Sequence, residues 1–201
     1  MTPALRIGVL ALQGNVAEHT RMLARAGATV SSVRRPGELD GLAGLVIPGG
    51  ESTVIDKLLR RVGLFDPLRA AIAGGLPVFG TCAGMILLAD RLVDGTADQQ
   101  TLGGLDVTVR RNAFGRQVDS FEHDLPITGL GEDAFRAVFI RAPWVEAVGP
   151  GVQVLAEVGG RPVAVRAWTL LATAFHPELT GDDRLHRFFC AMCSEPGPPV
   201  G

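Results

Sequence analysis

The sequence predicts a single α/β domain of three layers, in which helices cover both faces of an open, mostly parallel sheet that carries antiparallel additions. In the first half of the chain, short apolar runs alternate with segments of helical periodicity, and Gly or Pro separates them. From residue 101 onward, β-type segments follow one another with turns between them. The chain has 201 residues, 47% of them apolar, which suits one core. We expect the domain to span residues 1–194 and residues 195–201 to form a flexible tail.

The expected elements follow from local signals. Asn15 is placed to cap a helix that ends near Ala26, and Ser52 or Thr53 is placed to cap the next one. Further helices are expected over residues 66–73 and 182–192. The expected strands cover residues 6–12, 29–34, 44–47, 76–79, 102–110, 117–121, 134–140, 152–158, 162–166 and 170–174. In such a sheet, ligands bind beyond the carboxyl ends of the parallel strands.

The turn at Cys82 is the strongest candidate for chemistry. An apolar run ends at Phe79, and the apolar spacing of Met85, Leu88 and Leu92 is typical of a helix that follows. Glycines two residues before and after Cys82 permit the sharp turn of a nucleophile elbow. The start of a helix favours the thiolate form of the side chain. The alternative is a small cysteine buried in the core.

His176 is the best candidate for the base that a cysteine nucleophile needs. It follows the last expected strand, so it reaches the same sheet edge as Cys82. Pro177 keeps His176 extended, and in an extended chain Glu178 points the same way and approaches the ring. A polar turn is the alternative for this segment. The other histidines have weaker cases: His19 and His186 fall in expected helices and His123 in a polar turn.

Two further groups suit acyl transfer. Gly49 and Gly50 can bring backbone N–H groups close to an oxyanion, although a turn with a helix cap explains them equally well. Arg111 or Arg141, at strand ends, can pair with a substrate carboxylate. Cys190 and Cys193 raise the possibility of a metal or redox site with His186, but a metal site wants four ligands, and apolar neighbours favour structural thiols.

Composition argues against several classes. The net charge of −2 is spread along the chain, Tyr is absent and aromatic residues make up 5%, so nucleic acid is not an expected partner. No apolar segment approaches the ~20 residues of a membrane helix. The N-terminal segment continues into the first expected strand, unlike a cleavable signal, and three cysteines suit a reducing compartment. We expect a cytoplasmic protein.

Six segments together resemble one known family in the same order along the chain. The segments are LALQG (10–14), PGGEST (48–53), GTCAG (80–84), RNAFGRQ (111–117), FIRAP (139–143) and AFHPELT (174–180). They are similar to those of the glutaminase subunits of pyridoxal 5′-phosphate synthase, within the class I glutamine amidotransferases, which have a flavodoxin-like fold. The cysteine and His-Pro-Glu segments belong to the wider class. The first, second and fourth segments single out the family.

The resemblance implies a reaction and a site. Cys82 is the implied nucleophile, with His176 and Glu178 as its relay, and neither a cofactor nor a metal is needed. The implied oxyanion hole is formed by Gly49 and Gly50. The residues of the implied glutamine pocket are Gly50, Glu51, Ser52, Arg111, Ile140 and Arg141. The implied partner is a (β/α)₈-barrel synthase subunit, in a large hetero-oligomer, that condenses the ammonia with a pentose phosphate and a triose phosphate. Gln13 is expected near that interface. The resemblance also implies low activity without the partner.

Other functions and one departure remain. A glutaminase that serves another pathway would share the cysteine, histidine and glutamate, and a non-catalytic regulatory domain would keep these three residues without using them. The chain departs from the family at residues 166–169, where a polar Gln-Gly-type turn is usual. Trp168 there is expected to be an exposed apolar side chain on a hairpin.

Overall fold

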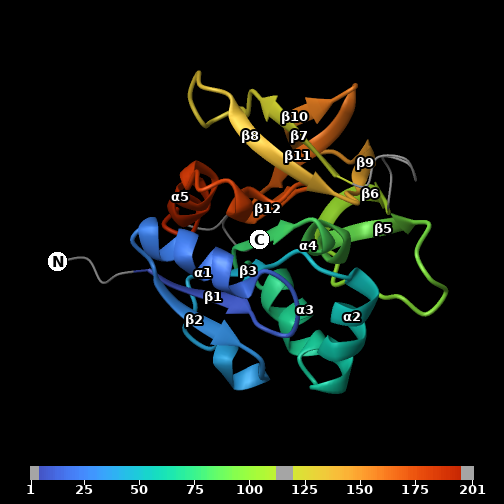
Figure 1. Ribbon diagram of the computed structural model, residues 1–201. Helices are drawn as coiled ribbons and strands as arrows, with labels where there is room; N and C mark the ends of the chain where they lie inside the picture. The colour runs from blue at the N-terminus through green and yellow to red at the C-terminus, as the bar shows by residue number, and fades with distance from the viewer. Residues whose placement is uncertain (1–4, 112–119, 196–201) are drawn as a thin grey trace.

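The fold is organised around one seven-stranded sheet (Figure 1). The computed structural model describes residues 5–111 and 120–195. The strand order is β10-β11-β12-β4-β3-β1-β2, parallel from β2 to β12 and antiparallel at β11 and β10. These strands are β1 (Arg6–Leu10), β2 (Thr29–Val33), β3 (Gly44–Ile47), β4 (Val78–Thr81), β10 (Gln153–Val158), β11 (Arg161–Ala167) and β12 (Leu170–Thr173).

Burial explains which strands lie in the middle of the sheet. Every residue of β3, β4 and β12 is buried, as expected for parallel strands covered on both faces. The edge strand β2 alternates less regularly and keeps two residues exposed. The parallel order 2-1-3-4 followed by β12 is that of flavodoxin-like folds, so the predicted fold class is confirmed.

In the part of the chain that the structure describes, five α-helices cover the sheet in two groups. They are α1 (Val16–Arg25), α2 (Ser52–Arg61), α3 (Phe65–Ala73), α4 (Ala83–Leu88) and α5 (Arg184–Met192). Helix α1 contacts α5, whereas α2 contacts α3 and α4, and the two groups lie on opposite sides of the sheet in Figure 1. Within residues 5–111 and 120–195, no helix combines the length and apolar character needed to cross a bilayer.

The other strands form two small sheets rather than extensions of the main one. β5 (Ala89–Val93), β6 (Leu105–Arg110) and β9 (Trp144–Val148) form a three-stranded sheet, and β7 (Ser120–Leu125) pairs with β8 (Phe135–Ile140) as an antiparallel hairpin. The six expected strands after residue 101 are therefore present, and the hairpin is the expected antiparallel addition. The five-residue strand β9 was not among the strands expected from the sequence.

The prediction that the helix after Gly84 reaches Leu92 is wrong. Helix α4 ends at Leu88, and Ala89 turns directly into β5. Leu92 is paired with Val109 of β6 in a parallel ladder. Leu92 lies at a helical interval from Leu88, yet it belongs to a strand that packs on the core. A short apolar run does not by itself distinguish a helix from a strand.

Of the two helix caps predicted from the sequence, the position of Asn15 is confirmed and that of Ser52 or Thr53 is wrong. Asn15 occupies the N-cap position of α1, but its side chain makes no cap hydrogen bond. The N-cap position of α2 belongs to Glu51, so Ser52 and Thr53 already lie inside the helix. The side chains of Asn15 and Ser52 hydrogen-bond to other parts of the chain instead.

Three expectations concern residues at the limits of the described structure. Residues 112–117 of the family-specific RNAFGRQ segment and the start of the strand expected at residue 117 lie outside it. Most of the expected tail also lies outside, so the boundary at residue 194 stays a prediction. The hairpin between β11 and β12 is described: Trp168 is 72% exposed with a φ of 51°, as its place on a turn led us to expect.

Candidate active site

Cys82 lies on a strained turn between β4 and α4. Its φ of 49° and ψ of −101° are rare for a residue with a side chain. A Cβ on Gly80 would lie 2.5 Å from the carbonyl carbon of Gly84, and a Cβ on Gly84 would collide with the carbonyl oxygen of Ile47. Only glycine fits at both places, which is the steric requirement that the sequence predicts for a nucleophile elbow.

The sheet register brings His176 to the cysteine. Thr173 at the end of β12 pairs with Thr81 at the end of β4, and the Cys82 N–H donates to the Thr173 carbonyl at 2.7 Å. A Cβ on Gly49 would collide with the His176 ring and would lie 3.2 Å from the Cys82 Cβ. The cysteine and histidine therefore lie together beside Gly49, at the carboxyl ends of three parallel strands.

Glu178 holds the other side of the His176 ring. The Nδ1 atom of His176 lies 2.8 Å from Oε1 of Glu178. The predicted contact is present, but the reason given for it is wrong: Pro177–Leu179 forms a 3₁₀ turn, not an extended segment. Proline fits the first position of such a turn, which folds the carboxylate back onto the ring.

The ionisation of the pair follows from its burial and its contacts. Burial alone would lower the pKa of His176, but hydrogen bonds to Cys82 and Glu178 and the attraction of both groups raise it to about 10. Burial alone would raise the pKa of Glu178, whereas the His19 and His176 rings and a hydrogen bond from Asn15 lower it to about 2. Glu178 is therefore a carboxylate and His176 an imidazolium at neutral pH.

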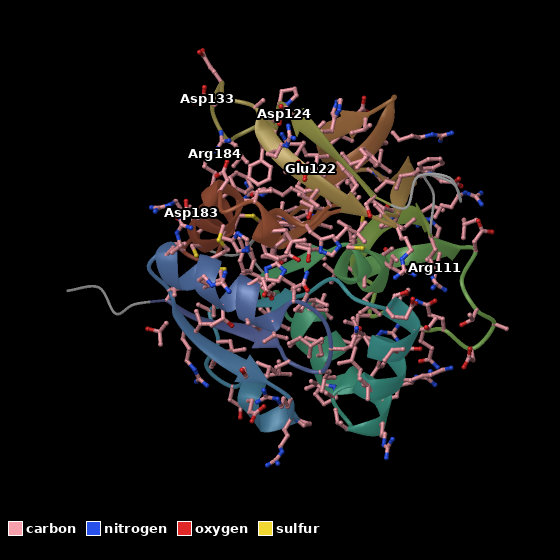
Figure 2. The ribbon with its side chains drawn as sticks, in the orientation of Figure 1. Arg111, Glu122, Asp124, Asp133, Asp183 and Arg184 are labelled. Carbon is pink, nitrogen blue, oxygen red and sulfur yellow. The ribbon has the colours of Figure 1, made fainter. Side chains whose placement is uncertain are left out.

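A second group of predicted residues forms a hydrogen-bonded cluster beside this site. Arg111 donates to Glu51 Oε1 at 2.9 Å and to Gln99 Oε1 at 3.1 Å. Gln99 in turn donates to the hydroxyl of buried Ser52 at 3.0 Å. In Figure 2, Arg111 lies between strand β5 and helix α2. Gln99 was not predicted, because it lies in a loop without any motif.

Three other predicted residues border the same region. Gln13 accepts the Glu51 N–H at 2.9 Å, and a Cβ on Gly50 would collide with the Gln13 side chain. The Ile140 carbonyl oxygen lies 3.9 Å from the Cys82 sulfur. Arg141 follows at the end of β8, exposed and with a φ of 43°. Gln13 is thus hydrogen-bonded to the loop that precedes α2.

One of the predicted oxyanion donors, the backbone N–H of Gly49, is hydrogen-bonded to a side chain of the protein. The Gly49 N–H donates to the Thr81 hydroxyl at 3.0 Å. In this structure that N–H is therefore directed at Thr81, beneath the elbow, and not toward a substrate. Thr81 was not predicted as a site residue.

Sequence reasoning also missed Asn15 and His19. Asn15 donates to Glu178 Oε1 at 2.9 Å, and Nε2 of His19 lies 3.3 Å from Glu178 Oε2. Their spacing of four places both on one face of α1, and this is the only local signal that could have linked them.

Cys190, in α5, and Cys193, at the C-cap of that helix, lie away from this site. Burial raises the pKa of both thiols, that of Cys193 to about 12, so neither is a reactive thiolate at neutral pH. Over residues 5–111 and 120–195, no three His, Cys, Asp or Glu side chains are grouped to hold a metal ion.

Comparison with known proteins places this geometry in a family. Residues 9–195 match the model of the SNO glutamine amidotransferase family. A pyridoxal 5′-phosphate synthase subunit PdxT of Parafrankia sp. is 67% identical over 186 residues, 92% of each chain. The PdxT subunit of Nocardioides sp. is 60% identical over 200 residues, which cover 97% of this chain and 99% of the relative.

Solved structures agree with the sequence matches. A crystal structure described as a glutamine amidotransferase superposes with a TM-score of 0.88 at 50% identity, and it covers 94% of this chain and 99% of its own. A putative GMP synthase subunit of Thermoplasma acidophilum, at 20% identity and a TM-score of 0.69, shares the fold. The chain therefore belongs to the SNO glutamine amidotransferase family.

Proposed function

We propose that this chain is the glutaminase subunit of a pyridoxal 5′-phosphate synthase and hydrolyses L-glutamine to L-glutamate and ammonia. The observation that carries the proposal is the arrangement of Cys82, His176 and Glu178 at one sheet edge, with the cysteine on a strained elbow. Nucleophile, base and orienting carboxylate in this order are the parts of an acyl-transfer triad. The names of the relatives give the pathway.

In the first half of the reaction, the Cys82 thiolate attacks the side-chain amide carbon of glutamine. The His176 imidazolium gives its proton to the departing nitrogen, which leaves as ammonia, and a γ-glutamyl thioester remains. Neutral His176 then removes a proton from water, which attacks the thioester. The thiolate leaves, glutamate is released and the imidazolium is restored. Glu178 keeps the ring in one orientation throughout.

The oxyanion of each tetrahedral intermediate needs backbone donors. We assign this role to Gly49 and Gly50, together with Ala83, the residue after the nucleophile, whose N–H starts α4. Because the Gly49 N–H donates to Thr81, the 48–50 loop has to reorient before it can serve. This supports low activity of the chain alone and stimulation by a partner.

The substrate pocket offers a partner for each of the two charged groups of an amino acid, the α-carboxylate and the α-ammonium group. Arg111 or Arg141 would pair with the α-carboxylate of glutamine, and Glu51 would accept its α-ammonium group. Ser52 and the Gly50 backbone would line the same side, with Ile140 beside the sulfur. The cluster of Arg111, Glu51 and Ser52 supports this assignment, because the three already share one hydrogen-bonded network.

The partner would be a (β/α)₈-barrel synthase subunit that takes up the ammonia, in a large cytoplasmic hetero-oligomer. Gln13 is assigned to the contact region, since it lies in the loop after β1 and bonds to the loop before α2. A partner that moves Gln13 would thus act directly on the oxyanion loop.

The test measures ammonia and glutamate release from glutamine by the purified chain, alone and with a synthase subunit from the same source. We expect release to rise sharply with the synthase and to be lost in Cys82→Ala. An electrophilic glutamine analogue should label Cys82 in the wild type. Absence of both release and labelling in the folded complex would refute the glutaminase proposal, and equal release with and without the synthase would refute the partner dependence.

A further inference from the structure

The second oxygen of Glu178 occupies an unusual position. Oε1 accepts from His176 and Asn15, while Oε2 is buried and has no hydrogen bond of good geometry within the described residues. The nearest donor is Nε2 of His19, at 3.3 Å, and the side chains of His19 and Glu178 are both fully buried. The distance suits a hydrogen bond although the angle is poor. A buried carboxylate oxygen without a donor is costly, so an adjustment of either group that completes this bond would be favourable.

His19 has a second buried histidine behind it. Its Nδ1 lies 3.0 Å from Nε2 of His186, and its Nε2 lies 3.1 Å from the Thr81 hydroxyl. Burial lowers the pKa of both rings, that of His186 to about 3, although Glu178 opposes the shift in each. Both histidines are therefore neutral near pH 7, and each carries one N–H.

The contacts select one tautomer. With its hydrogen on Nε2, His19 donates toward Glu178 and Thr81 and accepts the His186 Nε2–H at Nδ1. This assignment leaves a lone pair on His186 Nδ1 buried without a partner among the described residues, and it makes the Thr81 hydroxyl an acceptor for both His19 and Gly49. The reverse assignment points a His19 lone pair at the carboxylate and leaves the His186 Nδ1–H without an acceptor. A buried N–H without an acceptor costs more than a buried nitrogen lone pair without a donor, so the second tautomer is the less favourable one.

We propose that His19, held in its Nε2–H tautomer by His186, is a positioning residue that fixes the Glu178 carboxylate and thereby the His176 ring. With His19 in place, both carboxylate oxygens receive donors from two directions, so the plane of the group cannot turn. This rests on the proposed glutaminase function and adds to it a buried chain that runs from α5 through α1 to the triad.

The same ring also reaches the oxyanion loop. Thr81 accepts the Gly49 N–H at 3.0 Å and lies 3.1 Å from His19 Nε2. His19 is therefore in contact with the triad carboxylate and with the hydroxyl that holds the loop in its present orientation. The neutral imidazole of His19 thus lies between the carboxylate of the triad and the oxyanion loop.

The test compares two replacements of His19. His19→Gln keeps an N–H donor at about the reach of Nε2, and His19→Met keeps similar volume without a donor. We expect His19→Met to lower kcat by ~10–100-fold with KM for glutamine little changed, as for other residues that orient a catalytic group. His19→Gln should recover most of the loss. Met22→Leu, a buried change one turn along α1 that avoids the triad, is the matched control.

A second readout is independent of glutamine turnover. The titratable groups that face His19 are Glu178, His176, Glu18 and His186. The pKa of His176 is raised to about 10, so the pH dependence of Cys82 alkylation and the NMR titration of His176 at alkaline pH report on the pair. In His19→Met, a less firmly held carboxylate should move the alkaline midpoint to lower pH. His19→Gln and Met22→Leu should keep it.

The outcomes are distinct. Lower kcat and a lower alkaline midpoint in His19→Met, with recovery in His19→Gln, would support the positioning role. An unchanged midpoint in folded His19→Met, or equal impairment of the Met and Gln variants, would overturn it. If wild-type protein released no ammonia, the proposed function would fail, and the alkylation and NMR readouts would still decide the inference.

Discussion

Asn15 and Glu178, 163 residues apart in the chain, are joined by a hydrogen bond of 2.9 Å between the asparagine Nδ2 and the carboxylate Oε1. The same oxygen lies 2.8 Å from Nδ1 of His176. The first turn of α1 is thus attached to the proposed relay, and the residue that would normally cap the helix serves the site instead. A local stabilising role has been given up for a distant one.

Replacement of Asn15 should therefore affect catalysis more than folding. We expect Asn15→Ala to lower kcat for glutamine by about 10-fold, because one of the donors that orient Glu178 is lost. Asn15→Asp should lower it further, since two carboxylates at this distance cannot both ionise easily. Steady-state glutaminase assays with the synthase present measure both. Thr20→Ala, which removes only a hydrogen bond within α1, is the control, and equal rates for all three would contradict the expectation.

Gly49 should tolerate no side chain. A Cβ there would collide with His176 Cε1 and lie 3.0 Å from Nδ1, so Gly49→Ala must displace the ring from the cysteine. We expect at least a ~100-fold loss of kcat, comparable to the loss of one oxyanion donor. Gly37→Ala is a matched control, because a Cβ at Gly37 meets nothing within 4 Å. Labelling of Cys82 by an electrophilic analogue should slow in the same proportion, and labelling at the wild-type rate would contradict the displacement.

Much of the site could be predicted because its signals are local. Gly80 and Gly84 mark the elbow by their spacing, and the end of an apolar strand places His176 at the correct sheet edge. Most of the order of strands and helices was predicted for the same reason, but β5 and β9 were not. The error at Leu92 arose where a helix of six residues passes directly into a strand, and there the apolar interval suits both.

The remaining site residues could not be predicted because their roles depend on contacts between distant segments. His19 reaches Thr81 across 62 residues and His186 across 167. A polar residue on the buried face of a helix looks the same in sequence whether it contacts a backbone group, a water or a catalytic carboxylate. Only the packing of α1 against the ends of β4 and α5 distinguishes these cases.

Activity should fall at alkaline pH when His176 loses its proton. The pKa of this group is raised to about 10, so the imidazolium that protonates the leaving ammonia persists well above neutrality. We expect kcat/KM for glutamine to decline with a midpoint near pH 10. A decline centred near pH 6.5, the ordinary pKa of histidine, would show that Cys82 and Glu178 do not raise the pKa of His176.

Stability should fall on the acid side because of the buried histidines. The folded-state pKa of His186 is lowered to about 3, so between pH 6.5 and 3 the unfolded chain binds a proton that the folded chain excludes. The contribution of neutral His186 to the free energy of unfolding is present above pH 6.5 and is lost as the pH falls. Between pH 6.5 and 4.5 this amounts to about 2 kcal/mol of unfolding free energy.

Glu178, with its pKa lowered to about 2, acts in the same direction but only below pH 4.5. Urea unfolding at a series of pH values measures the slope. In His186→Met the slope between pH 6.5 and 4.5 should be smaller than in the wild type, whatever the absolute stability. An unchanged slope would mean that His186 is protonated in the folded protein.

Thr81 should restrain the oxyanion loop. Its hydroxyl accepts the Gly49 N–H, and Thr81→Val keeps the shape of the side chain while it removes the acceptor. The buried N–H then lacks a partner, which destabilises the present orientation of the loop by about 1–3 kcal/mol. We expect the ratio of glutaminase activity without the synthase to activity with it to rise by ~5-fold or more. Thr81→Ser, which keeps the hydroxyl, should retain the wild-type ratio. If Thr81→Val and Thr81→Ser gave the same ratio, the hydrogen bond to Gly49 would not be what keeps the isolated chain inactive, and a different contact, such as that between Gln13 and Glu51, would have to hold the loop.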